Sequence, residues 1–195
     1  LLMPLTKTWE ATLAVRTDDY TGFGRTTNPK VSTRWKPSDQ FLVRGSYNTG
    51  FRVPTFNQLY NGEQSAIFTG ATLVDPQNCP TGRVDAARPG CESIRPDIIS
   101  GGKLDLGPET AKMASLGFIW EPTANFSVGL DWWTIQREGT IQILTLTQLV
   151  DNYALLSNRF NRNAAGTLLS IDQRWVNAGE TQTEGIEINL RGAFN

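Results

Sequence analysis

The chain contains no histidine, and this absence removes several classes of function at once. Of its 195 residues, only two are cysteine and two are methionine. Without histidine there is no Ser-His-Asp triad, no imidazole general base and hardly any familiar zinc site. No other constellation of nucleophile and base replaces them. We therefore expect no enzyme, no metal ion and no cofactor.

A strong excess of charge and long apolar runs are also missing. The formal net charge is −1, and no run of lysine or arginine indicates binding to nucleic acid. No segment approaches the roughly 20 consecutive apolar residues that a membrane-spanning helix needs. These absences do not argue against a transmembrane β-barrel, because residues that face lipid and residues that face the lumen alternate along each of its strands.

What the sequence does contain is a set of segments in which apolar and polar residues alternate, as in β-strands with two different faces. Six such segments are expected, at about 8–17, 30–36, 41–48, 111–120, 126–133 and 186–194. The apolar positions of the last one are Ile186, Ile188, Leu190 and Phe194. The opposite faces carry charges of both signs, which must be hydrated or paired with a polar partner.

Two of the predicted hairpins share one pattern, 85 residues apart. Each has a tryptophan, a turn at proline and then a row of alternate apolar residues that ends in an aromatic. Aromatics at both ends of an apolar row are typical of strands that cross a bilayer. The pattern predicts a girdle at the membrane boundaries, made of Trp35, Tyr47, Trp120 and Trp132. In a soluble sheet, the same four side chains would be ordinary core aromatics.

The connections between the predicted strands differ greatly in length. Turns at 37–39 and 122–124 are short, about a dozen residues join the first two strands, and long excursions cover 49–110 and 140–180. Short turns at one end and long loops at the other are typical of outer-membrane barrels. Apolar residues at near-helical spacing predict a short helix over 144–157. The alternative is a soluble β-sandwich that uses the long loops for recognition.

Several motifs resemble those of one family. Gly50-Phe51-Arg52 is followed by Pro54, and Pro108-Glu109-Thr110 and Thr183-Glu184-Gly185-Ile186 come later in the chain. In this combination and order, they are similar to the barrel of TonB-dependent outer-membrane receptors, over nearly the whole chain.

The resemblance implies an all-β fold, an antiparallel transmembrane barrel of roughly 22 strands closed around an N-terminal plug. It implies a receptor in the outer membrane of a Gram-negative bacterium that imports a scarce nutrient such as an iron–siderophore complex. Its partners would be lipid, the nutrient and the TonB complex, the last through an N-terminal part. No plug or TonB box is found in residues 1–195, and both ends look cut, so we expect a segment of about six strands of a larger barrel. The excursions 49–110 and 140–180 would then be extracellular loops.

The resemblance also indicates which residues contact the ligand. The candidates lie at the loop bases and in the loops: Arg52, Asn57, Gln58, Tyr60, Trp133, Arg159 and Arg162. The alternative role for them is pairing with acidic residues or simple solvation. Cys79 and Cys91 lie close together in the first excursion and predict a disulfide formed in an oxidising compartment. Two free thiols or a metal site are the alternatives.

Overall fold

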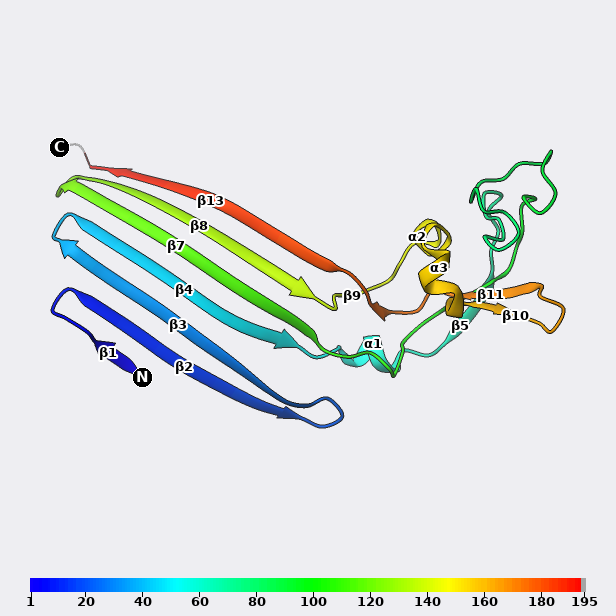
Figure 1. Ribbon diagram of the computed structural model, residues 1–195, viewed down its shortest axis with the longest axis horizontal. Coiled ribbons are helices and arrows are strands. Elements are labelled where there is room, and N and C mark those ends of the chain that lie inside the picture. The colour runs from blue at the N-terminus through cyan, green and yellow to red at the C-terminus, as the bar shows by residue number, and fades with distance from the viewer. Residues whose placement is uncertain (194–195) are drawn as a thin grey trace. The chain divides into compact units, whose positions relative to one another are not determined.

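The computed structural model describes residues 1–193 and divides into two compact units (Figure 1). The first unit contains Leu1–Val53, Gly107–Thr140 and the chain from Ala178 on, and the second contains Pro54–Leu106 and Ile141–Asn177. The second unit is therefore built from the two long excursions.

The first unit is a single antiparallel sheet of seven strands in the order β1-β2-β3-β4-β7-β8-β13. The strands are β1 (Leu2–Pro4), β2 (Trp9–Tyr20), β3 (Gly24–Ser38), β4 (Phe41–Arg52), β7 (Glu109–Thr123), β8 (Phe126–Glu138) and β13 (Glu180–Gly192). They lie side by side in Figure 1. All six predicted segments are strands of this sheet. Phe194, which the alternation assigns to the apolar face, lies outside the described residues.

One predicted connection is wrong. The link between the first two long strands was expected to take about a dozen residues, but β2 and β3 extend toward each other and leave only Thr21–Phe23. Gly22 and Gly24 adopt positive φ there, at 87° and 77°, a conformation that glycine reaches without strain. The strand ends pair through their backbones, with Asp18 opposite Thr26, although their polar side chains show no alternation.

The sheet has no core of its own within residues 1–193. Every buried apolar side chain of that range belongs to the second unit. In the sheet, Leu13, Phe118 and Leu130 are 38–44% exposed, and Ile188 is 65% exposed. A β-sandwich requires a second sheet packed on this apolar face. Within residues 1–193, the first unit provides no such layer.

The second unit is small and irregular. It contains α1 (Phe56–Tyr60), β5 (Gln64–Ile67), β6 (Asp97–Ser100), β9 (Ile141–Gln142), α2 (Leu146–Asp151), α3 (Tyr153–Leu156), the 3-10 turn η1 (Ser157–Arg159), β10 (Phe160–Arg162), β11 (Leu168–Asp172) and β12 (Val176–Asn177). Four of its strands form a sheet in the order β10-β11-β6-β5, and β12 pairs with β9. Its core includes Val74, Leu149 and Ile171, each at most 1% exposed.

The two excursions are joined inside this unit. β11 from the second excursion pairs in parallel with β6 from the first, with Ile171 opposite Ile98. Within residues 1–193, no helix has the length and apolar character required to cross a membrane.

Candidate functional site

The apolar face of the seven-stranded sheet is a continuous band. One row of register partners runs Trp9, Trp35, Val43, Phe118, Leu130 and Ile188, from β2 to β13. Each next row along the strands adds further apolar partners, such as Leu116 opposite Trp132. In that row Thr33 and Gly45 lie between Ala11 and Leu116, and the Thr33 hydroxyl is bonded to Trp9 Nε1 and to the Glu10 carbonyl. Beyond them the band continues with Leu13, Val31 and Tyr47.

Aromatic side chains mark both limits of this band. Toward the turns at Pro37 and Pro122 it ends in tryptophan and phenylalanine, and Phe41 stacks against Trp120 with ring centroids 6.2 Å apart. Toward the other end it reaches Tyr47 and Trp132. The distance from Phe41 to Tyr47 along β4 is about 20 Å at ~3.4 Å per residue. The four predicted girdle residues all lie on this face and are 39–47% exposed.

The band crosses the strands obliquely. On β13, the limit farther from the turns lies at Ile186, which is in the same register row as Ala11 on β2. On β2 the apolar face continues two rows beyond Ala11, to Val15. The limit near the turns shifts in the same direction by one row, from Leu190 to Trp9. One to two rows are ~7–14 Å, and five strand spacings are ~24 Å, so the limits run roughly 15–30° away from the perpendicular to the strands.

The opposite face of the sheet is polar, and an ion pair lies across its middle. Arg44 on β4 donates from Nε and Nη2 to Asp131 on β8, at 2.8–3.0 Å. The strand between them, β7, places Gly117 in register with both. A Cβ at residue 117 would overlap the Asp131 carboxylate and lie 2.6 Å from Arg44 Nε. Only glycine leaves room for this crossing.

Two of the predicted ligand contacts belong to the same sheet. Arg52, at the end of β4, donates from Nε and Nη2 to the Glu109 carboxylate, both at 2.8 Å. Trp133 lies on the polar face of β8, where a Cβ at Gly185 would be 2.8 Å from its Cζ2. Glycine at 185 therefore leaves room for the indole against β13.

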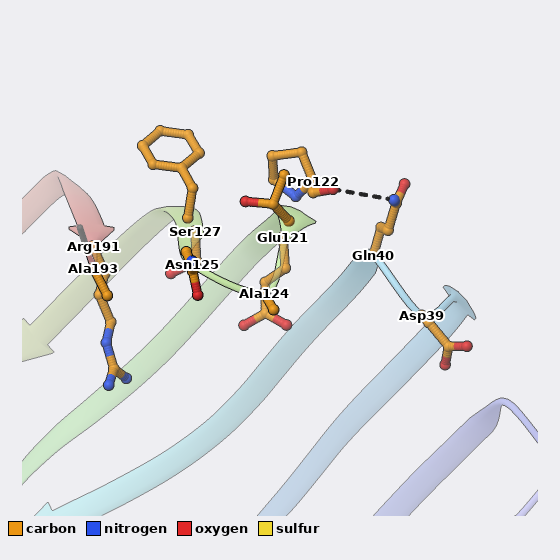
Figure 2. Close-up of a pocket in the computed structure, with 11 residues that line it drawn as sticks. Asp39, Gln40, Glu121, Pro122, Ala124, Asn125, Ser127, Arg191 and Ala193 are labelled. Carbon is orange, nitrogen blue, oxygen red and sulfur yellow. Dashed lines mark hydrogen bonds between the residues drawn. The ribbon is translucent and has the colours of Figure 1, made fainter. Parts of the chain in front are cut away.

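A polar hollow of about 450 Å³ lies where the two short turns of the sheet meet. Figure 2 shows the Gln40 side chain donating to the Pro122 carbonyl, at 3.3 Å. The Glu121 amide donates to the Gln40 carbonyl at 2.8 Å. Asp39, Glu121 and Arg191 supply the charges of its lining. These bonds join the two repeated hairpins to each other. Within residues 1–193, no group of three or more acidic or cysteine side chains could hold a metal ion.

The predicted disulfide is present in the second unit. Cys79 and Cys91 are bonded, with S–S at 1.99 Å. Both are fully buried and pack with Val74. The bond therefore closes the loop 79–91 within the first excursion and places its two sulfurs in the core of this unit.

Arg162 has a structural partner in that excursion. Its Nη1 and Nη2 donate to the two carboxylate oxygens of Asp75, at 2.7 and 2.6 Å. Asp75 also accepts from the Gln77 amide and from Asn78 Nδ2, each at 3.0 Å. Burial on its own raises the pKa of Asp75, but the bonds from Arg162 and the backbone outweigh it, and the pKa lies below its ordinary value.

Arg159 is even more enclosed. It is 5% exposed, and its Nη1 donates to the carbonyls of Asp172 and Arg174, at 3.3 and 3.0 Å. The Asp172 carboxylate in turn accepts from the Arg174 amide and guanidinium at 2.9–3.0 Å. Burial opposes ionisation of Asp172, but these bonds prevail and lower its pKa.

The remaining predicted contacts lie on α1, a single turn fixed at its start. Thr55 Oγ1 accepts from the Gln58 amide at 3.3 Å, and Gln58 Oε1 accepts from the Thr55 amide at 2.9 Å. This reciprocal capping box consumes the side chain of Gln58, which is only 8% exposed. Asn57 and Tyr60 are exposed, and Tyr60 contacts the ring of Phe56 with centroids 4.8 Å apart.

Phe56 is the residue of this region that the sequence analysis missed. The signal was present, because Thr55 and Gln58 have the spacing of a capping box and Phe56 lies four residues before Tyr60. On one helical turn, residues four apart share a face.

Comparison with known proteins gives one family. The family model described as TonB dependent receptor-like, beta-barrel, matches residues 1–195. No curated protein matches the chain.

Solved structures of similar fold are siderophore receptors. PirA from Acinetobacter baumannii is 18% identical, with 97% of this chain and 24% of that chain covered and a TM-score of 0.65. PirA from Pseudomonas aeruginosa is also 18% identical, with 97% and 29% covered and a TM-score of 0.61. A mutant of the ferric enterobactin receptor PfeA from P. aeruginosa, in complex with enterobactin, is 15% identical, with 95% and 22% covered and a TM-score of 0.65. At these identities the likeness shows the fold, and the chain spans about a quarter of those receptors.

Proposed function

Because this chain belongs to the TonB-dependent receptor β-barrel family, we propose that it forms a wall segment of an outer-membrane receptor that imports a scarce nutrient, such as an iron–siderophore complex. The receptor would draw energy from the TonB complex through a part outside this segment. The reaction that it carries out is transport, with no chemical change of the nutrient.

The observation that carries this proposal is the uncovered apolar band of the seven-stranded sheet. Burying one large apolar side chain is worth about 1.5–3 kcal/mol, so a band that spans six strands is costly to leave in water. Hydrocarbon tails would cover it, with Trp35 and Trp120 at one boundary and Tyr47 and Trp132 at the other. The band runs roughly 15–30° from the perpendicular to the strands, which agrees in kind with strands that are tilted in the membrane but is less than the tilt of about 35–45° typical of outer-membrane barrels.

The polar face would then line the lumen of the barrel. Its charges are matched in part within the sheet, as in the Arg44–Asp131 pair, and the rest would be hydrated or bonded to a polar partner. The second unit would lie outside the membrane, where an oxidising environment favours the Cys79–Cys91 bond.

The predicted ligand contacts fall into two groups under this proposal. Asn57 and Tyr60 are exposed and Trp133 is half-buried, and these three would contact the nutrient directly. The others are bonded within the protein and would act by holding the surfaces around it: Arg52, Gln58, Arg159 and Arg162.

The test uses the full-length protein in a Gram-negative host. We expect it in the outer-membrane fraction, with a gel mobility that changes on heating, as closed barrels show. Under iron limitation, deletion of its gene should reduce growth on at least one ferric chelate, and deletion of tonB in the intact strain should have the same effect. Recovery of the protein as a soluble monomer would refute the membrane proposal and favour the soluble binding module. Growth that is unaffected by tonB would refute energised import.

A further inference from the structure

Two of the motifs in the sequence meet in the sheet as one structural element. Gly50-Phe51-Arg52 ends β4, and Glu109-Thr110 begins β7. The register places Arg52 opposite Glu109 and Phe51 opposite Thr110. The first excursion lies between the two motifs in the chain, so they mark the points where it leaves the sheet and returns to it. We call the pair of Arg52 and Glu109 the neck clasp.

The neck clasp is a bidentate ion pair with a buried acid. Arg52 Nε and Nη2 donate to different oxygens of the Glu109 carboxylate, both at 2.8 Å. The Glu109 side chain is 8% exposed, whereas that of Arg52 is 49% exposed. Further parts of a receptor could only bury this carboxylate more deeply. Removing one partner of a buried pair is costly because it leaves the other charge unpaired, whereas replacing both partners by neutral groups costs little.

The clasp lies where β4 has fewer backbone partners than in the middle of the sheet. The pairing of β4 with β3 ends at Asn48, but its pairing with β7 continues to Arg52. A contact between side chains spans part of this end, because the rings of Phe51 and Tyr20 meet edge-on with centroids 5.3 Å apart. Strand ends with few partners open more readily than the centre of a sheet. The clasp is therefore placed where it can prevent the end of β4 from opening.

The chain beyond the clasp is also bonded across the excursion. α1 begins at Phe56, four residues after Arg52. In the second unit the Gly102 amide donates to the Asn61 carbonyl at 2.8 Å. A Cβ at Gly102 would lie 2.7 Å from the backbone of Leu59 and Asn61, so glycine is needed for this close approach. The outgoing and the returning parts of the first excursion are thus joined within each of the two units.

Arg52 has two conceivable roles in a receptor. It shares the polar face of β4 with Arg44, eight residues away, and under the proposed function this face lines the lumen. There it would either contact an anionic nutrient or support the wall. Its bidentate bond to a buried carboxylate favours support, because Glu109 already takes its charge and two of its donor groups.

We propose that Arg52 acts in import as a positioning residue, which through Glu109 fixes the place where the first excursion leaves the barrel wall and returns to it. This inference rests on the proposed function and gives the two motifs one shared role in it. The role needs the matched pair, and not the positive charge of Arg52 by itself.

The experiment compares Arg52→Gln, Glu109→Gln and the double variant in the full-length receptor, purified in detergent without a nutrient. Hydrogen exchange of the amides of 50–52 and 109–111 is the first readout. Arg52→Gln should speed this exchange by about tenfold or more, since a bond between charged groups contributes at least that much when it is shielded. The double variant should exchange more slowly than Arg52→Gln, because it leaves no buried charge unpaired.

Arg25→Gln is the matched control. Arg25 also lies opposite an acid in the register, Asp19, but the two are 3.6 Å apart and their side chains are 71% and 65% exposed. This variant should leave the exchange of 50–52 and 109–111 unchanged. The second readout is uptake of ⁵⁵Fe from ferric enterobactin by cells that carry each variant. Arg52→Gln should lower the uptake, and the double variant should restore most of it.

Two results would overturn the inference. Unchanged exchange in Arg52→Gln would show that the pair does not hold the strand ends. Uptake that is lowered equally in Arg52→Gln and in the double variant would show that the nutrient needs the positive charge itself. The exchange comparison uses no nutrient, so a receptor that shows the recovery in the double variant but fails the tonB test keeps the clasp and loses the proposed function.

Discussion

The ion pair across β7 leads to a sharp prediction about Gly117. Replacing this glycine with alanine adds one methyl group, which normally strengthens a strand because alanine loses less backbone freedom on folding than glycine. At residue 117 the methyl group would instead meet the Asp131 carboxylate and the Arg44 guanidinium. We expect Gly117→Ala to destabilise the barrel.

The magnitude follows from what the methyl group displaces. Hydrogen bonds to charged groups contribute about 1.5–3 kcal/mol when they are shielded, whereas exposed ion pairs contribute about 0–1 kcal/mol. The Arg44 side chain is 53% exposed and the Asp131 side chain 20% exposed, so the pair belongs between these limits. With some strain from overpacking, a loss of about 1–2 kcal/mol is expected.

Gly129→Ala is the matched control for this experiment. Gly129 also lies in the interior of a strand, on β8, and its added Cβ would meet the nearest atom, Cβ of Asn189, at an ordinary 3.5 Å. We expect this variant to be neutral or slightly stabilised. Both variants can be compared by urea titration of the full-length barrel in lipid vesicles, with the heat-dependent gel mobility as the readout of the folded fraction.

A variant without the ion pair tests whether the loss of stability comes from the contact of the methyl group with Arg44 and Asp131. In a variant that carries Arg44→Ser and Asp131→Ser, the space above residue 117 is no longer occupied by the ion pair. Gly117→Ala should then cost little. If Gly117→Ala is as harmless as Gly129→Ala, or if its cost is the same in both backgrounds, the steric account of the crossing is refuted.

Three further predictions concern the second unit. The pKa of Asp75 is lowered in the folded state, so the stability it contributes is present above its unfolded pKa of about 3.8 and is lost as the pH falls through the lower folded value. Cleavage of residues 54–106 by pepsin should therefore become faster as the pH falls from about 4 to about 2. Asp75→Asn leaves Arg162 without its anion, so this variant should be cleaved faster than the unaltered protein by trypsin at neutral pH, and equal rates would contradict the account. Replacing both Cys79 and Cys91 with serine removes a link between residues 12 positions apart, which should lower the free energy of unfolding of the second unit by about 3 kcal/mol. Proteolysis of residues 54–106 should become faster while the strands of the seven-stranded sheet stay protected. Equal cleavage of both units would contradict the account. Gly102→Ala should detach α1 from its support, seen as faster hydrogen exchange of the Asn57 to Asn61 amides, whereas unchanged exchange would show that the close backbone approach is not needed.

The sequence revealed the strands only where the two faces differ. All six segments with alternating residues became strands, and in each of them the apolar residues share one face and the polar residues the other. Beyond Thr17 and before Lys30, the chain continues as paired strand with polar residues on both faces. No periodicity marks such a stretch, so its extent and the tight turn at Gly22 could not be predicted.

The second unit was not predictable in the same way. Its sheet joins β6 to β11 across some 70 residues of chain, and strands of three to five residues carry too little pattern to be recognised. The disulfide was predictable, since two neighbouring cysteines in a loop leave few alternatives. The helical turns over 146–159 also had a visible spacing of apolar residues.

The arginines show why residue type alone assigns a site poorly. Arginine in a loop is a sensible candidate for binding an anionic ligand, and the sequence gives no sign of which carboxylate will reach it. In the fold, the partner of Arg162 is Asp75, 87 residues away, and the partner of Arg44 is Asp131, at the same separation by coincidence. In both cases the chain returns after a long detour, and the pairing depends on register and on the course of the excursions. For this chain, arginines that the fold has already paired are therefore poor evidence for a ligand surface.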